Sequence, residues 1–379
     1  MAARVEIRQN RYHDSVQLMY ITNTLRDITG VEQVFVAMAT QTNKEIFSEL
    51  GLSGPETKQA GNNDLLIGIE AETEQICDTV LQNIEELLTK HSIVCTSDQM
   101  PTSFEDALKV TLEANLCVVS VPGEYAKKEA AKALKNGLHV LLFSDKVSYE
   151  DELFLKKIAR DKGLLCMGPD CGVANINGTA LLVGSETNKG PIGIIGASGA
   201  GIQQVGALID RAGSGISQAI GTGGRDLKDE IGALTMLSAI EALETDNYTK
   251  VIVLISRKPG KKCESKVLQR VAACKKPVVC CFIGCQAETI ASVGAVAAIN
   301  LEDAAVKALS LIDIPFNLSF DTEKISNIAQ RACKKMLPEQ KYIRGLFCSG
   351  TFCEESISVL QPLIGNIYSN IEVEQRFQL

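Results

Sequence analysis

The residues best suited to bind an anion lie in a glycine-rich turn near the middle of the chain. Residues 192–201 read IGIIGASGAG, and apolar side chains recur at helical spacing after them. A buried strand that ends in such a turn and leads into a helix leaves free backbone N–H groups at the positive end of the helix dipole. We therefore predict a site for phosphate or an acyl phosphate, made by Ser198, Gly199, Ala200 and Gly201.

Two other interpretations apply to this turn. The spacing Gly196-x-x-Gly199-x-Gly201 reverses the usual dinucleotide-binding order, and no acidic residue ends the next predicted strand, which argues against NAD. The glycines could also serve only close packing of the helix on the strand. We favour the phosphate site over packing alone.

A second turn follows the next predicted strand and reads GTGGRDL at 221–227. The carboxyl ends of neighbouring parallel strands meet at one edge of a sheet, so this turn should lie beside the first. Arg225 would neutralise a phosphate there, and Asp226 is either a helix cap or a catalytic group. The turn extends the predicted phosphate site by Gly221, Thr222, Gly223 and Gly224.

A third turn, near the end of the chain, resembles the first. Residues 345–350 read GLFCSG, one residue shorter than GIIGASG at 193–199, and both place Ser-Gly between a predicted strand and a predicted helix. Two such helices could direct their N-termini at one anion. The residues expected to contribute here are Ser349, Gly350 and Thr351.

Two earlier strand ends are predicted to line a cleft. Cys171 could act there as a nucleophile, but no histidine is near it in sequence, and we favour a structural role. The predicted cleft residues are Pro122, Gly123, Gly168, Pro169, Asp170 and Cys171.

The chain has three histidines, His13, His91 and His139. All three lie away in sequence from the glycine turns of the middle segment, so we predict no phosphohistidine.

Composition limits the class of protein. The 379 residues include 38 Lys and Arg against 46 Asp and Glu, a net charge of −8 that argues against a nucleic-acid partner. The most apolar run, 277–285, is shorter than the ~20 residues that span a bilayer, and the N-terminal residues lack the apolar core of a signal peptide. Thirteen cysteines, an odd number without zinc-site spacing, indicate reduced thiols and no metal. We therefore predict a cytoplasmic protein with no membrane partner.

Strands and helices must hold these turns, and the apolar pattern predicts two alternating sets of them. Such alternation, with strands that are unbroken apolar runs, is typical of a parallel sheet with helices on both faces. The first set has strands at Val34–Ala37, Asp64–Ile69, Leu116–Val121, Val140–Phe143 and Leu164–Met167 and helices at 73–89, 124–136 and 148–162. The second has strands at Ile192–Ile195, Ile216–Ile220, Val251–Ile255 and Val278–Phe282 and helices at 200–212, 227–244 and 263–274.

The polar stretch at 184–191 predicts a boundary between a first domain, 1–185, and a second, 186–315. The remaining segment, 316–379, is predicted to have a helix at 322–336, one strand at Tyr342–Cys348 and a helix at Cys353–Leu360. One strand with two helices cannot bury its own faces. We interpret this segment as an incomplete α/β domain, which missing chain or a partner subunit would complete.

The combination of motifs resembles the FdrA family, which is similar to the α-chain of succinyl-CoA synthetase and to other CoA ligases. The likeness to FdrA covers nearly the whole chain, and the looser likeness to the ligases runs from about residue 100 to about residue 260. GPDCG at 168–172 resembles the GPNCPG of the ligases. The other motifs are VSVPGEYAKKEA (119–130), LLFSDKVSYEDE (141–152), KGLLCMGPDCG (162–172), IGIIGASGAGIQ (192–203) and AIGTGGRDL (219–227).

This resemblance implies an α/β fold of three parts: a doubly wound Rossmann-like (CoA-binding-like) domain, a flavodoxin-like CoA-ligase domain, and the start of a second ligase-like domain. Ligases hold an acyl phosphate or phosphohistidine at the N-terminus of a "power helix", which corresponds to residues 198–200, and a partner domain brings a second, for which 349–351 is the candidate. The ligases' phosphorylated histidine has no counterpart in the loop 283–289, and their glycine-rich CoA loop has none in residues 8–17.

Ligases also place a glutamate just after the third strand of this domain, where this chain has Arg257 and Lys258. These cations would attract phosphate or a carboxylate substrate. The equally weighted alternative is a solvated loop with a turn at Pro259-Gly260. Arg257 therefore joins Arg225 and Asp226 as a candidate catalytic residue.

The resemblance implies two classes of function. The first is an enzyme subunit that handles acyl or carbamoyl phosphate without a phosphohistidine, as in allantoin breakdown, where oxalurate and phosphate give oxamate and carbamoyl phosphate; acyl-CoA synthetase activity is the alternative. The second is a non-catalytic scaffold that binds nucleotide or CoA. The ligands considered are phosphate, carbamoyl phosphate, nucleotide and CoA, and the expected assembly is a homo-oligomer or one with partner subunits.

Overall fold

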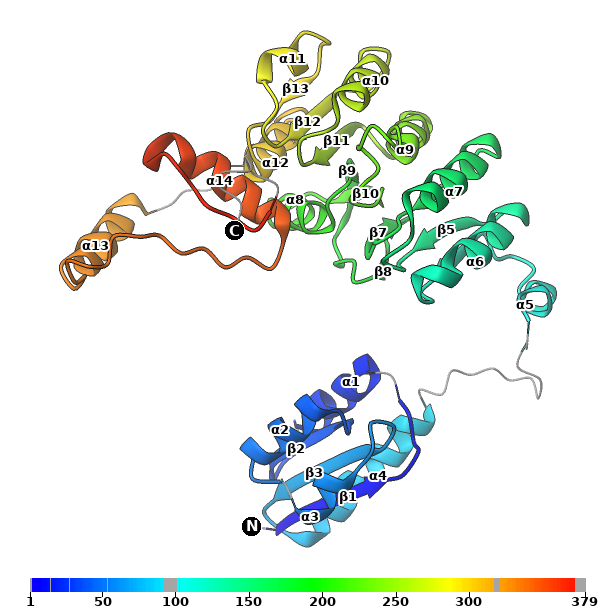
Figure 1. Cartoon of the computed structure of the whole chain (residues 1–379), viewed down its shortest axis with the longest axis vertical. Helices are drawn as coiled ribbons and strands as arrows, with labels where there is room; N and C mark the ends of the chain where they lie inside the picture. The colour runs from blue at the N-terminus through cyan, green and yellow to red at the C-terminus, as the bar shows by residue number, and fades with distance from the viewer. Residues whose placement is uncertain are drawn as a thin grey trace. The chain divides into compact units, whose positions relative to one another are not determined.

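The computed structural model describes residues 2–13, 15–26, 28–52, 54–90, 101, 103–316 and 321–371. It divides into two compact units, residues 1–110 and residues 111–379 (Figure 1). This division corrects the expected first domain, because residues 1–110 fold apart from the strands predicted to share their sheet.

The first unit is built on an antiparallel sheet in the order β1-β3-β2. Apolar residues of α1 and α4 cover one face, and Phe47 of α2 packs on the other. The predicted parallel sheet is wrong here, because the connection between β2 and β3 contains only two short helices and brings β3 back antiparallel to β2. The elements are β1 (Ala2–Arg8), α1 (Ser15–Arg26), β2 (Val31–Met38), α2 (Gln41–Glu49), α3 (Pro55–Gln59), β3 (Leu65–Ala71), α4 (Glu74–Lys90) and α5 (Phe104–Val110).

The second unit begins with a small parallel sheet in the order β4-β5-β6. Here the alternation predicted from sequence is confirmed. Buried alanines of α6 and Leu155 of α7 pack inward. The elements are β4 (Leu116–Val119), α6 (Gly123–Lys135), β5 (His139–Leu142), α7 (Tyr149–Asp161) and β6 (Cys166–Met167).

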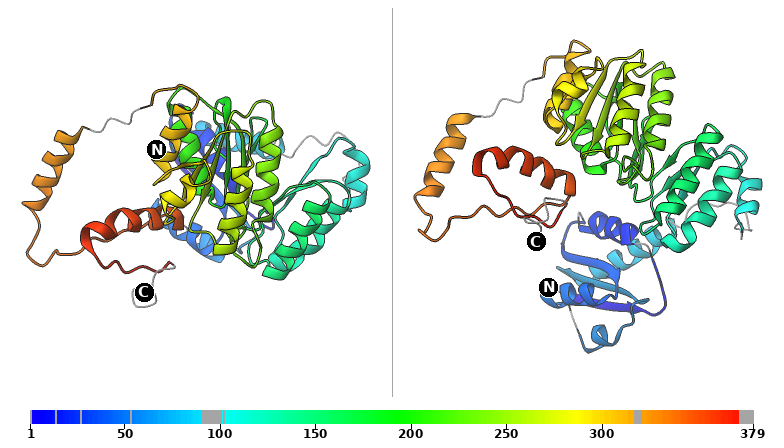
Figure 2. Two further views of the ribbon diagram at one scale, coloured as in Figure 1. Left: turned by 90° about the horizontal axis from the view of Figure 1, so that it is seen from above. Right: turned by 45° about the horizontal axis from the view of Figure 1, so that its top comes forward.

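The larger sheet of this unit holds the glycine turns. Its seven strands lie in the order β13-β12-β11-β9-β10-β7-β8, with β9 to β13 parallel. The helices α8 and α12 cover one face, and α9 and α10 cover the other (Figure 2). The elements are β9 (Lys189–Gly196), α8 (Gly199–Arg211), β10 (Ile216–Gly221), α9 (Leu234–Thr245), β11 (Val251–Ser256), α10 (Lys261–Ala272), β12 (Val278–Phe282), α11 (Ala287–Ala291), β13 (Val296–Ala297) and α12 (Leu301–Ser310).

The central strand β11 shows why the sheet is covered on both faces. Val251, Val253 and Ile255 pack against α8 and α12, whereas Ile252 and Leu254 pack against α9 and α10. Every residue of β11 is buried. An unbroken apolar run is therefore the pattern that this position in the sheet requires.

A hairpin that the sequence analysis did not predict joins this sheet. β7 (Val173–Ile176) and β8 (Thr179–Leu182) pair with each other, and β7 pairs antiparallel with β10. The boundary expected at residue 185 is therefore too late, because residues 173–182 already belong to the larger sheet.

The helix predicted at 227–244 begins later than expected. Residues up to 231 form turns, and α9 starts only at Leu234. Gly232 and Ala233 have φ angles of 86° and 60°, in the left-handed region that interrupts an α-helix.

The C-terminal segment keeps its helices but not its strand. It contains α13 (Thr322–Cys333) and α14 (Gly350–Ile364), and no strand forms at residues 342–348. The residues of α13 are all exposed, and Leu346 is fully exposed. An isolated extended segment has no neighbour to accept its backbone hydrogen bonds, so the predicted strand Tyr342–Cys348 is wrong for this chain.

Candidate functional site

The first glycine turn forms a capped helix N-terminus. Ser198 has extended backbone angles, and its Oγ accepts a hydrogen bond from the Gly201 N–H at 2.9 Å. This bond satisfies one of the donors of the first turn of α8. The N–H groups of Gly199 and Ala200 remain as donors without a helical acceptor.

The third turn also forms a helix N-terminus capped by a serine, and it lies against the first. Ser349 caps α14, and its Oγ accepts from the Thr351 N–H at 3.2 Å. The hydroxyl groups of Thr351 and Ser198 are hydrogen-bonded at 2.7 Å, and both side chains are buried. Two helix N-termini more than 150 residues apart in sequence therefore meet at one place.

A pocket of about 160 Å³ lies between these helix ends, and we call it the glycine pocket. Parts of all three predicted turns line it, together with the start of the β7 strand. Its lining residues are Asp170, Cys171, Gly172, Val173, Gly196, Ala197, Ser198, Gly199, Ala200, Gly221, Gly223, Gly224, Ser349 and Thr351.

The glycines of the turns serve two purposes. A Cβ at Gly201 would lie 2.7 Å from Ile255 Cγ2, and one at Gly196 would lie 2.7 Å from Ile202 Cγ1, so these two glycines permit close packing. Gly224 differs, because the nearest atom to a Cβ there is the Ala197 carbonyl oxygen at 4.0 Å. At Gly199 the Cβ would meet only Val173, at 3.1 Å to Cγ2. Packing therefore accounts for some of the glycines, and Gly199 and Gly224 keep the pocket open.

Asp226 lies beneath the glycine pocket rather than in its lining. Its buried carboxylate accepts hydrogen bonds from the N–H groups of Thr235 at 3.1 Å and Met236 at 2.8 Å, and so caps α9. The helix cap predicted for Asp226 is therefore correct, but the capped helix starts at Leu234, seven residues later than predicted. With both oxygens engaged, this carboxylate holds the turn in place.

A buried lysine joins Asp226 to α7. Lys156 Nζ lies 2.8 Å from Asp226 Oδ1 and 2.8 Å from Glu152 Oε1, and it donates to the Thr222 carbonyl oxygen at 2.9 Å. Burial alone would lower the pKa of Lys156, but the two carboxylates outweigh it and the pKa is raised. The lysine is therefore charged and fixes the second glycine turn, of which buried Thr222 is a part.

Arg225 is held by this network as well. Its Nη2 lies 2.9 Å from Glu152 Oε2 and donates to the Val147 carbonyl oxygen at 2.8 Å, and its guanidinium lies 4.5 Å from the centre of the Tyr149 ring. Sequence analysis missed Glu152 and Lys156. Their spacing of four residues on the apolar face of α7, beside Leu155 and Ala159, was the available signal.

Cys171 lines the glycine pocket as an uncharged thiol. Burial raises its pKa to about 11, and its Sγ donates to the Val173 carbonyl oxygen at 3.6 Å. Partial burial and the nearby Asp145 carboxylate raise the pKa of Asp170. Of the predicted cleft residues, these two line the pocket, and the other four do not: Pro122, Gly123, Gly168 and Pro169.

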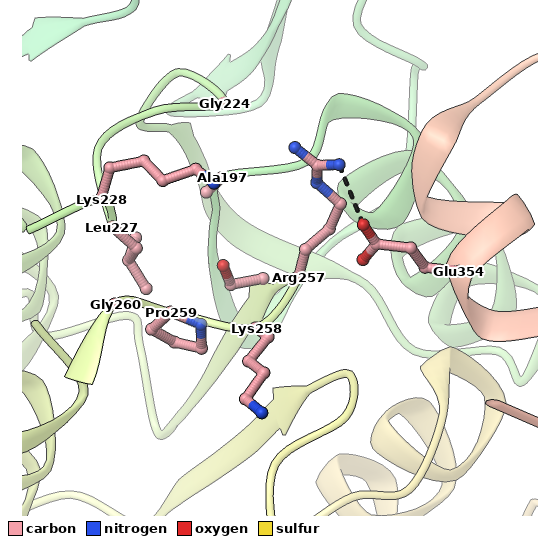
Figure 3. A pocket seen from close by; sticks show the side chains of 10 residues that line it. Ala197, Gly224, Leu227, Lys228, Arg257, Lys258, Pro259, Gly260 and Glu354 are labelled. Carbon is pink, nitrogen blue, oxygen red and sulfur yellow. Dashed lines mark hydrogen bonds and ion pairs between the residues drawn. The ribbon is translucent and has the colours of Figure 1, made fainter. Parts of the chain in front are cut away.

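A second pocket, of about 300 Å³, opens beside the first, and we call it the cationic pocket (Figure 3). Ala197 and Gly224 line both pockets. Arg257 extends from the end of β11, and its Nη1 lies 2.9 Å from Glu354 Oε1 of α14. The remaining lining residues are Leu227, Lys228, Ser256, Lys258, Pro259 and Gly260.

Neither of the two described histidines is among the residues that line the glycine pocket or the cationic pocket. His139 Nδ1 accepts the Leu165 N–H at 2.9 Å, and burial lowers the pKa of this imidazole. The His13 N–H donates to Met38 Sδ in the first unit. His91 lies outside the described residues.

The chain is similar to proteins of the CoA-ligase superfamily. It is 45% identical to Uncharacterized protein YahF of Escherichia coli (strain K12), over all of this chain and 74% of that protein. It is 27% identical to succinate–CoA ligase [ADP-forming] subunit alpha 1 of Archaeoglobus fulgidus, over 48% of this chain and 61% of that subunit. The ATP citrate lyase of Methanothrix soehngenii shares the fold with a TM-score of 0.50 at 16% identity, over 65% of this chain and 47% of that one.

Two family models match parts of the chain. The model of a CoA binding domain matches residues 187–284, which contain the first two glycine turns, and not the expected first domain. The model described as AllF, heavy metal-associated domain, matches residues 1–100.

The described residues of the first unit do not fit a heavy metal. Cys77, their one thiol, lies on the buried face of α4, and burial raises its pKa. No group of three His, Cys, Asp or Glu within the described ranges could hold a metal ion, and no helix there is long and apolar enough to cross a bilayer.

The curated ligases and the lyase extend well beyond the part that this chain matches, since the chain covers less than two thirds of each. The match to YahF covers this whole chain and most of that protein. The chain belongs to the family of YahF, within the CoA-ligase superfamily.

Proposed function

We propose that this chain is an FdrA-like enzyme subunit that binds a phosphate group in the glycine pocket and handles an acyl or carbamoyl phosphate without a phosphohistidine. The observation that carries the proposal is the meeting of two capped helix N-termini, where Ser198 and Thr351 are hydrogen-bonded at 2.7 Å. Both helix dipoles point their positive ends at the pocket, and each contributes about 0.3–1 kcal/mol to binding an anion, or more when buried.

The pocket provides N–H donors, and its one thiol is not activated as a nucleophile. The free first-turn N–H groups of α8 and α14 suit a phosphate or a developing oxyanion. The Cys171 thiol stays protonated at neutral pH, because its pKa is about 11. The chemistry proposed here is therefore stabilisation of a reaction between bound substrates and not attack by a side chain.

The reaction we propose is carbamoyl transfer between oxalurate and phosphate. A phosphate oxygen attacks the carbamoyl carbon of oxalurate, and the bond from that carbon to the oxamate nitrogen breaks. The nitrogen takes up the proton that the attacking hydrogen phosphate loses, so the products are carbamoyl phosphate and oxamate. The N–H groups of the helix ends would stabilise the oxyanion formed at the carbamoyl carbon.

The proposed phosphate site is tested by titrating the full chain with inorganic phosphate and carbamoyl phosphate in a calorimeter. Gly199→Ala adds a methyl group to the pocket wall, 3.1 Å from Val173 Cγ2, and should weaken phosphate binding about tenfold. Gly206→Ala in the same helix is the matched control, because its Cβ would have only ordinary contacts at 3.9 Å. Unchanged phosphate affinity in a folded Gly199→Ala protein would refute the site.

Acyl-CoA synthetase activity is the second candidate, and it is favoured by the succinate–CoA ligase relatives. If it passes through a phosphohistidine, labelled ATP should leave an acid-labile, base-stable label on a histidine. Our proposal predicts no such label. A chain that binds phosphate and a partner protein but shows neither activity would instead be the non-catalytic scaffold.

A further inference from the structure

The cationic pocket lies where sheets of this topology bind ligands. The strands run in the order β10-β9-β11, so the connections after β9 and β11 leave in opposite directions along the sheet. Open α/β sheets bind ligands at such a reversal, outside the carboxyl ends of the strands. Ala197 follows β9, and Arg257 follows β11, and both line this pocket.

The pocket has an excess of positive charge. Three cations and one carboxylate line it: Lys228, Arg257, Lys258 and Glu354 (Figure 3). Arg257 and Glu354 form an ion pair in which the two side chains are 34% and 17% exposed. Lys258 is exposed and makes no ion pair among the residues that the structure describes.

We propose that the cationic pocket binds the carboxylate of a short substrate whose reacting carbonyl group reaches the glycine pocket, and that Glu354 occupies Arg257 when this substrate is absent. The proposal rests on the proposed function and names the substrate class for the same site. A volume of about 300 Å³ is at the lower end for ligand pockets, which suits a substrate of a few heavy atoms.

The residues that line both pockets determine how the substrate would be oriented. Because Ala197 and Gly224 line both pockets, a molecule with its carboxylate near Arg257 would place its other end beside the phosphate site. A Cβ at Gly224 would have no atom closer than 4.0 Å, so this boundary is open. The class is therefore a short acid that carries its reacting carbonyl group at the end away from the bound carboxylate.

Glu354 is a competitor in this scheme. A guanidinium binds a carboxylate through two parallel hydrogen bonds, and a substrate carboxylate would offer Arg257 the same interaction that Glu354 does. Glu354 lies in α14, the helix whose N-terminus forms one side of the glycine pocket. Exchange of carboxylates on Arg257 would therefore alter how α14 is held at the moment when substrate binds.

The test measures binding of oxamate, and separately of inorganic phosphate, to the full chain by calorimetry, with neutral oxamide as the ligand control. Arg257→Gln should weaken oxamate binding about tenfold or more, because it removes a charge-assisted hydrogen bond. Glu354→Gln removes the competitor and should tighten oxamate binding about two- to fivefold. If the pair were only structural, the two variants would change oxamate affinity in the same direction.

Two further lysine variants test the carboxylate site even if Arg257 or Glu354 proves essential for folding. Lys258→Gln should weaken oxamate about two- to fivefold, whereas Lys250→Gln, at the opposite end of β11, makes the same change in net charge and should leave it unchanged. Equal effects of the two variants, or no binding of oxamate to the native chain, would overturn the proposal. Oxamate binding without phosphate binding would overturn the proposed phosphate site and leave the carboxylate site standing.

Discussion

The two helix ends that meet at the glycine pocket have the same cap but different supports. Ser198 and Ser349 both have extended backbone angles, with φ of −139° and −147°, and both accept an N–H from the helix that they cap. The strand before α8 lies between two others in the larger sheet. The segment before α14 has no strand and is exposed.

This difference shows that a helix cap can form from local sequence alone, whereas a strand depends on tertiary contacts. A Ser-Gly turn is sufficient to start a helix, because the serine side chain and the first-turn N–H groups are neighbours in the chain. A strand needs a partner, and residues 342–348 have none among the described residues. The polar contacts that hold α14 to the sheet domain include Ser198–Thr351, Arg257–Glu354 and Leu301–Glu355.

The largest expected effect is a difference in amide exchange between the two helices. The amides of α8 should exchange only through near-global unfolding, and those of α14 through local opening, a difference of about 5 kcal/mol or more. Exchange followed by mass spectrometry on the full chain measures it. Inorganic phosphate should slow exchange in α14 if it binds between the helix ends. Equal protection of α8 and α14 without ligand would show that α14 does not open independently of the sheet.

The second effect concerns the buried ion pairs that Lys156 makes beneath the glycine pocket. Lys156→Met would leave the carboxylates of Glu152 and Asp226 buried without their cation, and should lower the free energy of unfolding by about 3–5 kcal/mol. Urea unfolding followed by circular dichroism measures the loss. Lys157→Met, an exposed neighbour in α7, is the control and should change stability by less than about 0.5 kcal/mol. A Lys156→Met protein as stable as this control would show that the network does not hold the second glycine turn.

Sequence analysis succeeded where local pattern and final structure coincide. The strands β9 to β12 and the helices α8 and α10 were predicted because their apolar runs and periodicity match burial on both faces of a parallel sheet. The first two glycine turns were placed together for the same reason, since parallel strands bring their carboxyl ends to one edge.

The features that sequence analysis did not predict depend on contacts between residues far apart in the chain. The edge strand β1 carries the charged residues Arg4, Glu6 and Arg8 and gives no apolar run. Asp226 was expected to cap the helix that follows it directly, but its carboxylate reaches α9 across the turn at Gly232 and Ala233. Neither Lys156 nor Glu354 could be placed at the site, because each is brought there by the packing of a helix from another part of the chain.

The third effect is a difference in thiol reactivity between the two sides of the pocket. At pH 8 the thiolate fraction of Cys171, with a pKa of about 11 against an ordinary 9.0, should be about 100-fold below that of an unperturbed thiol. Cys348 is exposed beside the third turn and should react with iodoacetamide well before Cys171, as peptide mass spectrometry would show. Rapid labelling of Cys171 in the native protein would contradict the burial of the pocket wall.

The same pKa shift predicts how stability changes in alkali. Because folding raises the pKa of the Cys171 thiol, its neutral form stabilises the native state below pH 9, and this contribution is lost as the pH rises from 9 to 11. Cys171→Ser has no thiol to ionise and should show a smaller loss of stability over this range in urea unfolding at each pH. An equal loss in both proteins would assign the alkaline effect to other groups.

The smallest effect compares the two caps directly. Ser198→Ala removes the acceptor of the Gly201 N–H and the partner of Thr351, so it should lower the free energy of unfolding of the second unit by about 1–2 kcal/mol. Ser349→Ala removes a cap of the same kind, but α14 opens before the sheet unfolds, so the urea midpoint should stay within error while exchange in α14 becomes faster. Ser198→Thr and Ser349→Thr keep a hydroxyl acceptor and serve as controls for each site. If both alanine variants shift the urea midpoint equally, α14 unfolds together with the sheet, and the two supports are equivalent despite the missing strand.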